Sequence, residues 1–429
     1  AKRKAKEANL SNITFLELSF EDLLSRKDLT DFDLITLHGV WSWISQENRE
    51  RIIVFLRNSL KPGGAAAISY NSLPGWINSS PLQRMLMEYG SLSSSKSDKK
   101  IIDSLKFVET LKTNGCRALT ESHTFGSSDS DPINIHDKNH VSYLAHEYLN
   151  QHWQPLYASE TIRMLEQAKL DFVADASMLA NFPDLMLKPE QKKIYDSYTD
   201  PSFRELIKDY FVNRKFRRDI YIKGAQKISE KRRDLLLSGY SLALTIPISK
   251  TQYNIKTPAG EASLPHAKYS DIYEQLGQGP KKLANLRSRN STPSILEIAG
   301  ILVGSGQAAP IIWNHNDHSL DSADTYNKSV VQKILDQEES STTLAIPLTG
   351  TGISVNIMEA VIFSALSDGV QLSNLKKHTL DTFSKGGAPL MIDGKKVQDG
   401  TEAGGALDVA YDWFEDHILE TWRHLSLIR

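Results

Sequence analysis

The chain has 429 residues, of which 40% are hydrophobic and 24% are charged, and its formal net charge is -2. This length predicts about two to four domains, and the near-neutral charge gives no overall attraction to nucleic acid or to an anionic membrane. Cys116 is the only cysteine, which excludes an intrachain disulfide and fits a reducing, cytoplasmic compartment. No apolar run approaches the roughly 18 residues needed to span a bilayer.

Residues 12–76 alternate between strand and helix patterns in the order of a parallel sheet. Strands are predicted over 12–18, 31–37 and 65–70, and a helix over 47–60 precedes the turn Lys61-Pro62-Gly63-Gly64. This order is typical of α/β proteins, whose ligands lie beyond the carboxyl ends of the strands. The candidate ligand-binding segments are therefore 19–21, 37–43 and 70–76.

A helical insertion is predicted after the third of these strands, where it is placed to cover a substrate. Helical periodicity marks residues 81–90 and 99–111, and the serine-rich segment 91–97 between them predicts a loop. Another polar loop is expected at 127–132. A helix over 159–168 and strands over 170–174 and 217–223 then return the chain to the sheet.

A different composition begins near Leu235. Alternation over 241–255 predicts paired strands, and the patterns at 269–276 and 294–303 predict helices, which together indicate a small winged-helix-like module. The last region begins near Ser341 and ends in an aromatic-rich helix over 408–427.

Three short segments give these elements a family resemblance. Ser69-Tyr70-Asn71-Ser72-Leu73-Pro74-Gly75-Trp76, the segment YLAHEYL at 143–149 and the segment NRKFRRD at 213–219 resemble class I S-adenosylmethionine-dependent methyltransferases that carry a methyltransferase regulatory domain. The rickettsial outer-membrane-protein lysine methyltransferases are relatives of this kind, and residues 347–353 resemble a late segment of the same family. The resemblance implies a Rossmann-like α/β sheet, S-adenosylmethionine as cofactor and a protein lysine as methyl acceptor.

The chain departs from this family at its beginning. The family's glycine-rich turn after the first strand, and its acidic residue after the second, have no counterpart here, and the chain opens with Ala1. We therefore expect a fragment that binds the cofactor weakly by itself. The expected domains are a partial methyltransferase domain at 1–234 with a regulatory helical insertion at about 78–150, the winged-helix-like module at 235–337 and a C-terminal domain at 338–429.

The resemblance also assigns the cofactor residues. It places the adenine end of S-adenosylmethionine at Ser19, Phe20 and Glu21, with the Glu21 carboxylate meeting the adenine amino group. It places Leu37 and His38 near the methyl group. A solvated carboxylate at a helix start is the alternative for Glu21, and a turn histidine that bonds the backbone is the alternative for His38.

The acceptor side is expected at His38, Tyr70 and Asn71, enclosed by tryptophans. A histidine near neutral pKa suits proton transfer, and a phenol and an amide can accept a hydrogen bond from an amine. In an extended segment Trp41 and Trp43 would face one side and, with Trp76, wall off an aliphatic acceptor. Core packing of the tryptophans and turn stabilisation around Pro74-Gly75 remain open alternatives.

Other patterns do not support a metal or nucleic-acid site. His146 and His152 lie six residues apart, about 240° around a helix, so both cannot face one zinc ion. The basic stretch 204–233 contains alternating apolar residues, which favours sheet packing over nucleic-acid binding. A non-catalytic binding scaffold and a small-molecule methyltransferase are the competing functions. The oligomeric state is open, with a homodimer as one arrangement.

Overall fold

The computed structural model describes residues 2–120, 138–312, 317–336, 341–386, 391–392, 395–396 and 400–428. The chain forms two compact units. The sheet unit comprises Glu17–Lys227 with Thr257–Gly260, and the C-terminal unit comprises Ala1–Leu16, Ile228–Lys256 and Glu261–Arg429. The division into three domains at 234/235 and 337/338 stays a prediction.

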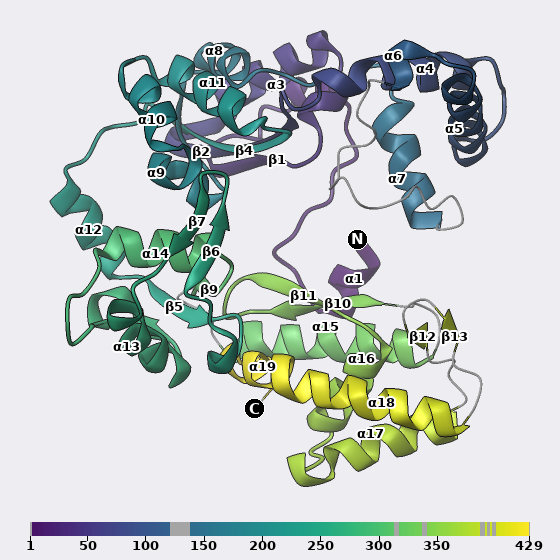
Figure 1. The fold of residues 1–429 in the computed structure, drawn as a ribbon, viewed down its shortest axis with the longest axis vertical. Coiled ribbons are helices and arrows are strands. Elements are labelled where there is room, and N and C mark those ends of the chain that lie inside the picture. The colour runs from purple at the N-terminus through teal and green to yellow at the C-terminus, as the bar shows by residue number, and fades with distance from the viewer. Residues whose placement is uncertain are drawn as a thin grey trace. The chain divides into compact units, whose positions relative to one another are not determined.

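The sheet unit is built on four strands in the order β1-β2-β4-β3, and Figure 1 labels β1, β2 and β4 of this sheet. Strand β1 (Phe32–Leu37) runs parallel to β2 (Leu60–Asn71), and β4 (Phe216–Lys223) is antiparallel to both β2 and β3 (Leu170–Asp175). Helix α3 (Gln46–Ser59) joins β1 to β2, as the β-α-β pattern predicts. The strand predictions for 31–37, 65–70, 170–174 and 217–223 are confirmed, and β2 also takes in the segment Lys61-Pro62-Gly63-Gly64.

One face of this sheet is covered by helices. Alternate residues of a strand point to opposite faces, and Ala66, Ile68 and Tyr70 of β2 pack in one cluster with apolar residues of α3 and α8 (Ala158–Glu166). Helix α11 (Pro201–Val212) packs on α8 and supplies polar partners on this face. We call it the covered face.

The other face, which we call the open face, keeps exposed apolar side chains. Leu34 of β1 is 56% exposed, Val173 of β3 is 44% exposed and Phe216 of β4 is 40% exposed. Near the carboxyl end of β2, however, Ser69 and Asn71 are buried. Within the described part of the sheet unit, the open face is therefore buried near the carboxyl end of β2 and exposed at the three apolar positions just named.

The strand predicted over 12–18 is wrong. These residues form no ladder, and Ile13, Leu16 and Leu18 are exposed. A strand requires a partner for its backbone N–H and C=O groups, and no described strand lies beside this segment. Ser19 instead caps helix α2 (Phe20–Ser25), because its Oγ accepts a hydrogen bond from the Asp22 backbone N–H at 3.0 Å.

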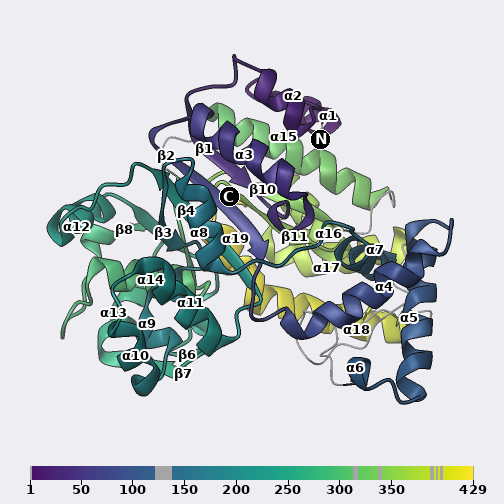
Figure 2. The same ribbon diagram turned by 90° about the horizontal axis from the view of Figure 1, so that it is seen from above.

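The helices predicted at 81–90 and 99–111 are confirmed, and they lie beside two further helices of the segment between β2 and β3 (Figure 2). Helices α4 (Ser80–Ser91), α5 (Ser97–Thr113), α6 (Arg117–Thr120) and α7 (Lys138–Tyr148) bury Leu82, Leu86, Ile101 and Leu144 together with Trp76. The loop predicted at 127–132 lies outside the described residues. The sheet unit also contains the shorter elements η2 (Ile77–Ser79), η3 (Met178–Asn181), α9 (Pro183–Met186) and α10 (Pro189–Asp196).

The first part of the C-terminal unit corrects the strand pairing expected over 241–255. Strand β5 (Ser241–Leu244) pairs with β8 (Lys281–Lys282) and β9 (Ala308–Pro310), whereas β6 (Asn254–Thr257) pairs with β7 (Gly260–Ser263). Pro247 and the 3-10 turn η4 (Ile248–Lys250) separate β5 from β6, because proline lacks the N–H that a ladder needs. Helices α13 (His266–Gly277) and α14 (Ile295–Gly304) confirm the two predicted helices, η5 (Leu283–Asn285) is a further 3-10 turn, and α12 (Glu230–Ser238) precedes β5. The winged-helix assignment stays a prediction.

The remainder of the C-terminal unit is mainly helical. Helix α18 (Gly400–Phe414), the π-helix η6 (Glu415–Leu419) and α19 (Glu420–His424) follow one another, which confirms the helix predicted over 408–427. The other elements are α1 (Lys2–Glu7), α15 (Asp317–Leu335), α16 (Ile357–Ser367), α17 (Leu372–Gly386), the hairpin β10 (Thr342–Ile346) with β11 (Thr351–Val355), and β12 (Met391–Ile392) with β13 (Lys395–Lys396). None of the helices in the described ranges has the length and apolarity that crossing a membrane requires.

Candidate active site

The turn after β1 presents His38 beside the end of β2. Gly39 takes a left-handed conformation with φ +62°, and its backbone N–H donates to Ser69 Oγ at 2.9 Å. His38 Nδ1 lies 3.4 Å from the same hydroxyl oxygen, and the His38 side chain is exposed. Because Ser69 points to the open face, the imidazole sits at the open-face side of the carboxyl ends of β1 and β2, within reach of solvent.

The tryptophans after this turn do not form the expected wall. Residues 41–43 form the 3-10 turn η1 (Trp41–Trp43), in which successive side chains rotate by about 120°, so Trp41 and Trp43 do not share one side. Trp41 has no exposed surface and packs in the core with α3 residues. Trp43 is half-buried and stacks on His146 of α7, with ring centroids 5.5 Å apart.

Asn71, the last residue of β2, is joined to the helical insertion. Its side-chain Nδ2 donates to Glu147 Oε1 of α7 at 2.6 Å, and Trp153 Nε1 donates to the same oxygen at 3.0 Å. Its backbone N–H donates to Ser42 Oγ at 2.8 Å. Glu147 is only 3% exposed, and burial raises the pKa of its carboxyl group, although both hydrogen bonds oppose that rise.

Arg49 is a buried cation beneath the turn. Its Nε donates to the Trp41 carbonyl oxygen at 3.0 Å, and its Nη1 donates to the side-chain oxygens of Gln154 at 2.7 Å and Gln46 at 3.1 Å. Burial lowers the pKa of this guanidinium. Arg49 thereby fixes the backbone that carries Trp41 and Trp43.

Tyr70 does not converge with His38. It has no exposed surface, it belongs to the covered face, and its hydroxyl donates to Asp219 Oδ2 of β4 at 2.7 Å. Burial, and then the adjacent Asp219 charge, raise the pKa of the Tyr70 phenol well above its usual value. The expected crevice shared by Tyr70, Asn71 and His38 is therefore not found, because neighbouring strand residues point to opposite faces.

Trp76 also lies away from a shared crevice. It is 4% exposed, its Nε1 donates to the Lys215 carbonyl oxygen at 2.7 Å, and its ring meets Trp153 edge-on at 5.8 Å. It packs in the core of the helical insertion. This corrects its expected place in a substrate wall and agrees with the core-packing alternative.

The residues expected at the adenine end lie around the start of α2. Ser19 is its cap, and Phe20 is half-buried against the sheet core. Glu21 is exposed, with its carboxylate 3.4 Å from Arg51 Nη2 of α3. Leu37 ends β1 on the covered face, where it is half-buried against the same core. Contact of these residues with a cofactor stays a prediction.

The residues weighed for metal or nucleic acid have other partners. His146 stacks on Trp43, and His152 Nε2 lies 3.1 Å from Gln151 Nε2. Among the described residues, no group of three or more His, Cys, Asp or Glu side chains could hold a metal ion. In the basic stretch, Lys208 and Arg217 are buried against carboxylates of the sheet unit.

Sequence reasoning missed Glu147, Trp153 and Ser69 as parts of this arrangement. A signal for Glu147 was present, because it lies three residues after Leu144 on the helix face that also carries the buried Val141 and Tyr148. A carboxylate on an apolar helix face requires a partner. The signal for Ser69 was its position two residues before Asn71 on one strand, which places both on one face.

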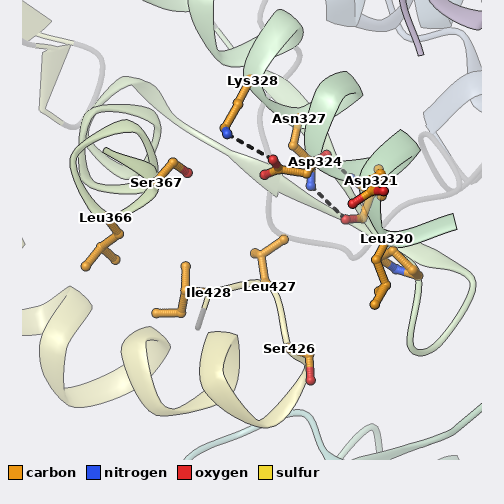
Figure 3. Close-up of a pocket in the computed structure, with 13 residues that line it drawn as sticks. Leu320, Asp321, Asp324, Asn327, Lys328, Leu366, Ser367, Ser426, Leu427 and Ile428 are labelled. Atoms are coloured by element: carbon orange, nitrogen blue, oxygen red, sulfur yellow. Dashed lines mark hydrogen bonds and ion pairs between the residues drawn. The ribbon is translucent and has the colours of Figure 1, made fainter. Parts of the chain in front are cut away.

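A separate cavity of about 560 Å³ lies within the C-terminal unit (Figure 3). Asp321, Asp324 and Lys328 reach toward it from α15, and Leu366 and Ser367 come from α16. Lys328 pairs with Asp324 at 2.9 Å. These groups neutralise one another in part and offer no arrangement for transferring a methyl group, so the carboxyl ends of β1 and β2 remain the candidate active site.

Comparison with known proteins places this geometry in a family. The model of a predicted methyltransferase regulatory domain matches residues 140–223, which include Glu147 and strands β3 and β4. The protein sll1526 of Synechocystis sp. is 32% identical over 411 residues, covering 94% of this chain and 79% of that protein. RP028 of Rickettsia prowazekii is 32% identical over 154 residues, covering 35% of this chain and 58% of that protein.

Solved structures share the fold. The structure of PKMT2 from Rickettsia typhi matches with a TM-score of 0.61 and 20% identity, covering 99% of this chain and 85% of that one. PKMT2 in complex with AdoHcy matches with a TM-score of 0.65 and 19% identity, covering 100% and 86%. These likenesses show that the chain has the PKMT2 fold, a mixed α/β architecture.

Proposed function

Because the chain belongs to the same family as the Synechocystis protein sll1526 and contains a methyltransferase regulatory domain, we propose that it is an S-adenosylmethionine-dependent methyltransferase that acts on lysine side chains of a protein. The observation that carries the proposal is the contact of the His38–Gly39 turn with Ser69 at the carboxyl ends of β1 and β2, with Asn71 on the same face of β2. Ligands of doubly wound sheets bind at this edge. The AdoHcy bound to PKMT2 is the demethylated form of the same cofactor, which supports the assignment.

In the proposed complex the cofactor extends from Ser19–Glu21 to Leu37 and His38. The exposed Glu21 carboxylate suits the adenine amino group, since a carboxylate accepts hydrogen bonds and cannot donate them. When bound, S-adenosylmethionine supplies a methyl group on a positively charged sulfur. The chain's own residues position the acceptor beside that methyl group, which accounts for most of the rate advantage in a transfer of this kind.

The acceptor lysine must lose a proton before it reacts. From a reference pKa of about 10.4, forming the neutral amine at pH 7 costs roughly 4.6 kcal/mol. The lone pair of the neutral nitrogen attacks the methyl carbon as the carbon–sulfur bond breaks, and the sulfonium becomes a thioether. The exposed His38 imidazole lies where it can take the proton that the nitrogen releases.

The test is radiolabelled methyl incorporation into proteins of the source cell, followed by acid hydrolysis and amino-acid analysis. We expect label in methylated lysine and a rate that rises from about pH 7 to 9, because the neutral amine increases nearly tenfold per pH unit while it is a minor species. His38→Ala should slow the transfer, whereas His152→Ala, which changes an exposed histidine outside this turn, should not. Label confined to small metabolites would instead support a small-molecule methyltransferase, and no label with any acceptor would support a binding scaffold.

A further inference from the structure

Glu147 is an acidic side chain buried at the end of β2, although no step of methyl transfer proposed above uses it. It comes from α7 of the helical insertion, is 3% exposed, and has no cation among its hydrogen-bond partners. Burying a carboxylate against neutral donors is costly unless the donors are well placed. Its two donors, Asn71 Nδ2 and Trp153 Nε1, converge on one oxygen at 2.6 and 3.0 Å.

This contact determines how the Asn71 amide is turned. The two ends of an asparagine amide differ only in that one is an NH₂ donor and the other a carbonyl acceptor. Glu147 Oε1 accepts from both donors, so it holds the NH₂ end of the Asn71 amide and turns Oδ1 the other way. Within the described chain, Asn71 Oδ1 accepts no hydrogen bond. This oxygen is also not fully buried, so another molecule can contact it.

The location of Asn71 suits its Oδ1 to accept a hydrogen bond from a ligand. Asn71 lies on the open face two residues beyond Ser69, whose hydroxyl contacts the His38 turn. An acceptor atom here suits a ligand group that carries an N–H, such as a neutral amine. It disfavours a carboxylate acceptor, which has no hydrogen to donate to Oδ1.

We propose that Glu147 is a positioning residue for methyl transfer: it orients the Asn71 amide so that Oδ1 accepts a hydrogen bond from the amine that receives the methyl group. This inference rests on the proposed function and adds to it the group that selects an N–H-bearing acceptor. It also gives α7 a role at the site, because the helical insertion supplies the carboxylate while the sheet supplies the amide.

A double-mutant cycle on the full chain tests the inference. Glu147→Met keeps the length of the side chain but removes the acceptor oxygen, so nothing holds the NH₂ end of the Asn71 amide. Glu147→Gln keeps a carbonyl oxygen, which the Trp153 N–H holds in place, and should retain most of the activity. We expect Glu147→Met to lower kcat roughly five- to tenfold with little change in KM for S-adenosylmethionine, and Asn71→Ala to lower kcat at least as much. In the Asn71→Ala background, adding Glu147→Met should change kcat less than about twofold, because the effect passes through Asn71.

Glu88→Met is the matched control, since it removes an exposed carboxylate from α4 of the same insertion and should leave kcat unchanged. A structural tie between α7 and β2 would change the free energy of unfolding in Glu147→Met while leaving kcat at the wild-type value, which would overturn the inference. Equal losses of kcat in the two backgrounds would overturn it as well. If the wild-type chain transfers no methyl group to any amine, the proposed function fails first; if it does transfer and the cycle is additive, only the role of Glu147 fails.

Discussion

Tyr70 and Asn71 are neighbours on β2, yet their surroundings differ in nearly every respect. On the covered face, Tyr70 joins a network in which Arg217 donates to three carboxylates, those of Glu205, Asp209 and Asp219. On the open face, Asn71 meets Glu147, and its Oδ1 has no partner within the described chain. The four charged side chains of this network all have hydrogen-bond partners, whereas Asn71 Oδ1 on the open face has none within the described chain.

This difference separates residues that hold the sheet from residues that can meet a ligand. A fully satisfied buried network rigidifies its surroundings, but it has no remaining capacity for another molecule. An acceptor without a partner contributes little to stability and can bind a donor that arrives. Changes on the covered face should therefore alter the free energy of unfolding, and changes on the open face should alter methyl transfer.

The largest effect is expected from Arg217→Met. Arg217 has no exposed surface, and its loss leaves the buried Asp219 without a cation. Glu205 and Asp209 each lose one cationic partner and keep Lys208 and Arg214 respectively. Removing one partner of a buried ion pair costs about 3–5 kcal/mol. Chemical denaturation should show this loss, and Arg218→Met, at the exposed neighbouring position, should show little. A loss below about 1 kcal/mol in Arg217→Met would mean that the network does not hold the sheet.

Asp219 should make the covered face sensitive to pH. Burial raises its pKa to about 6 against an ordinary value of 3.8, while Arg217 and the Tyr70 hydroxyl oppose the rise and Asp175 and Glu205 add to it. The folded chain thus holds this proton more tightly than the unfolded chain does. Protonation of Asp219 therefore adds to the free energy of unfolding. This contribution is fully present below pH about 3.8 and is lost as pH rises through about 6, a change of at most roughly 3 kcal/mol.

The measurement is urea unfolding of the wild type and Asp219→Asn from pH 4 to 8. The amide cannot titrate, so the wild type should lose stability relative to Asp219→Asn as pH rises through this window. Asp209 and Glu205 titrate in both proteins, and the difference between the two curves removes much of their contribution. A difference that stays constant, or grows in the wild type's favour, would contradict the raised pKa.

The sheet was largely predictable from sequence, because strands β1, β2 and β3 are mainly apolar between clear turn residues, and β4 carries apolar residues among its charged ones. The segment 12–18 carries a similar pattern but lies beside no described strand, and local pattern does not report whether a partner exists. The pairing of β5 with β8 and β9 was not predictable for the same reason. Strand pairing is a long-range property, whereas the pattern that predicts a strand is local.

The site was only partly predictable. Tyr70 and Asn71 were assigned to one pocket although adjacent strand residues point to opposite faces, so the alternation already present in the sequence argued against the pair. Trp41 and Trp43 were misplaced because a 3-10 turn replaces the extended segment that their alternation assumed. The contact of Glu147 with Asn71 joins residues 76 positions apart, which no short-range pattern could show.

Asn71→Ala tests whether the open face contributes to methyl transfer. It removes the only side-chain acceptor assigned to the amine, and a hydrogen bond of this kind is worth about 1–2 kcal/mol, or roughly 5- to 30-fold in kcat. The assay is methyl transfer to a lysine-bearing protein at saturating S-adenosylmethionine, with Asn114→Ala as control. Asn114 is exposed at the end of α5 and should tolerate the change. Wild-type kcat in Asn71→Ala would remove this residue from the site.

The smallest effect is expected from Tyr70→Phe, and this change gives the most direct test of the difference between the covered face and the open face. The change deletes the hydroxyl that donates to Asp219, but that carboxylate still accepts from Arg217 and from Tyr221, whose hydroxyl lies 3.2 Å away. The cost in unfolding free energy should be about 1 kcal/mol, and kcat should stay within about twofold of the wild type. Tyr221→Phe provides a matched change on the same carboxylate and should behave alike. A Tyr70→Phe protein that is fully stable yet more than about tenfold slower, beside a normal Tyr221→Phe protein, would move the acceptor to the covered face. The covered face would then bind the acceptor amine, and the hydrogen bond from Tyr70 to Asp219 would have to break to admit it.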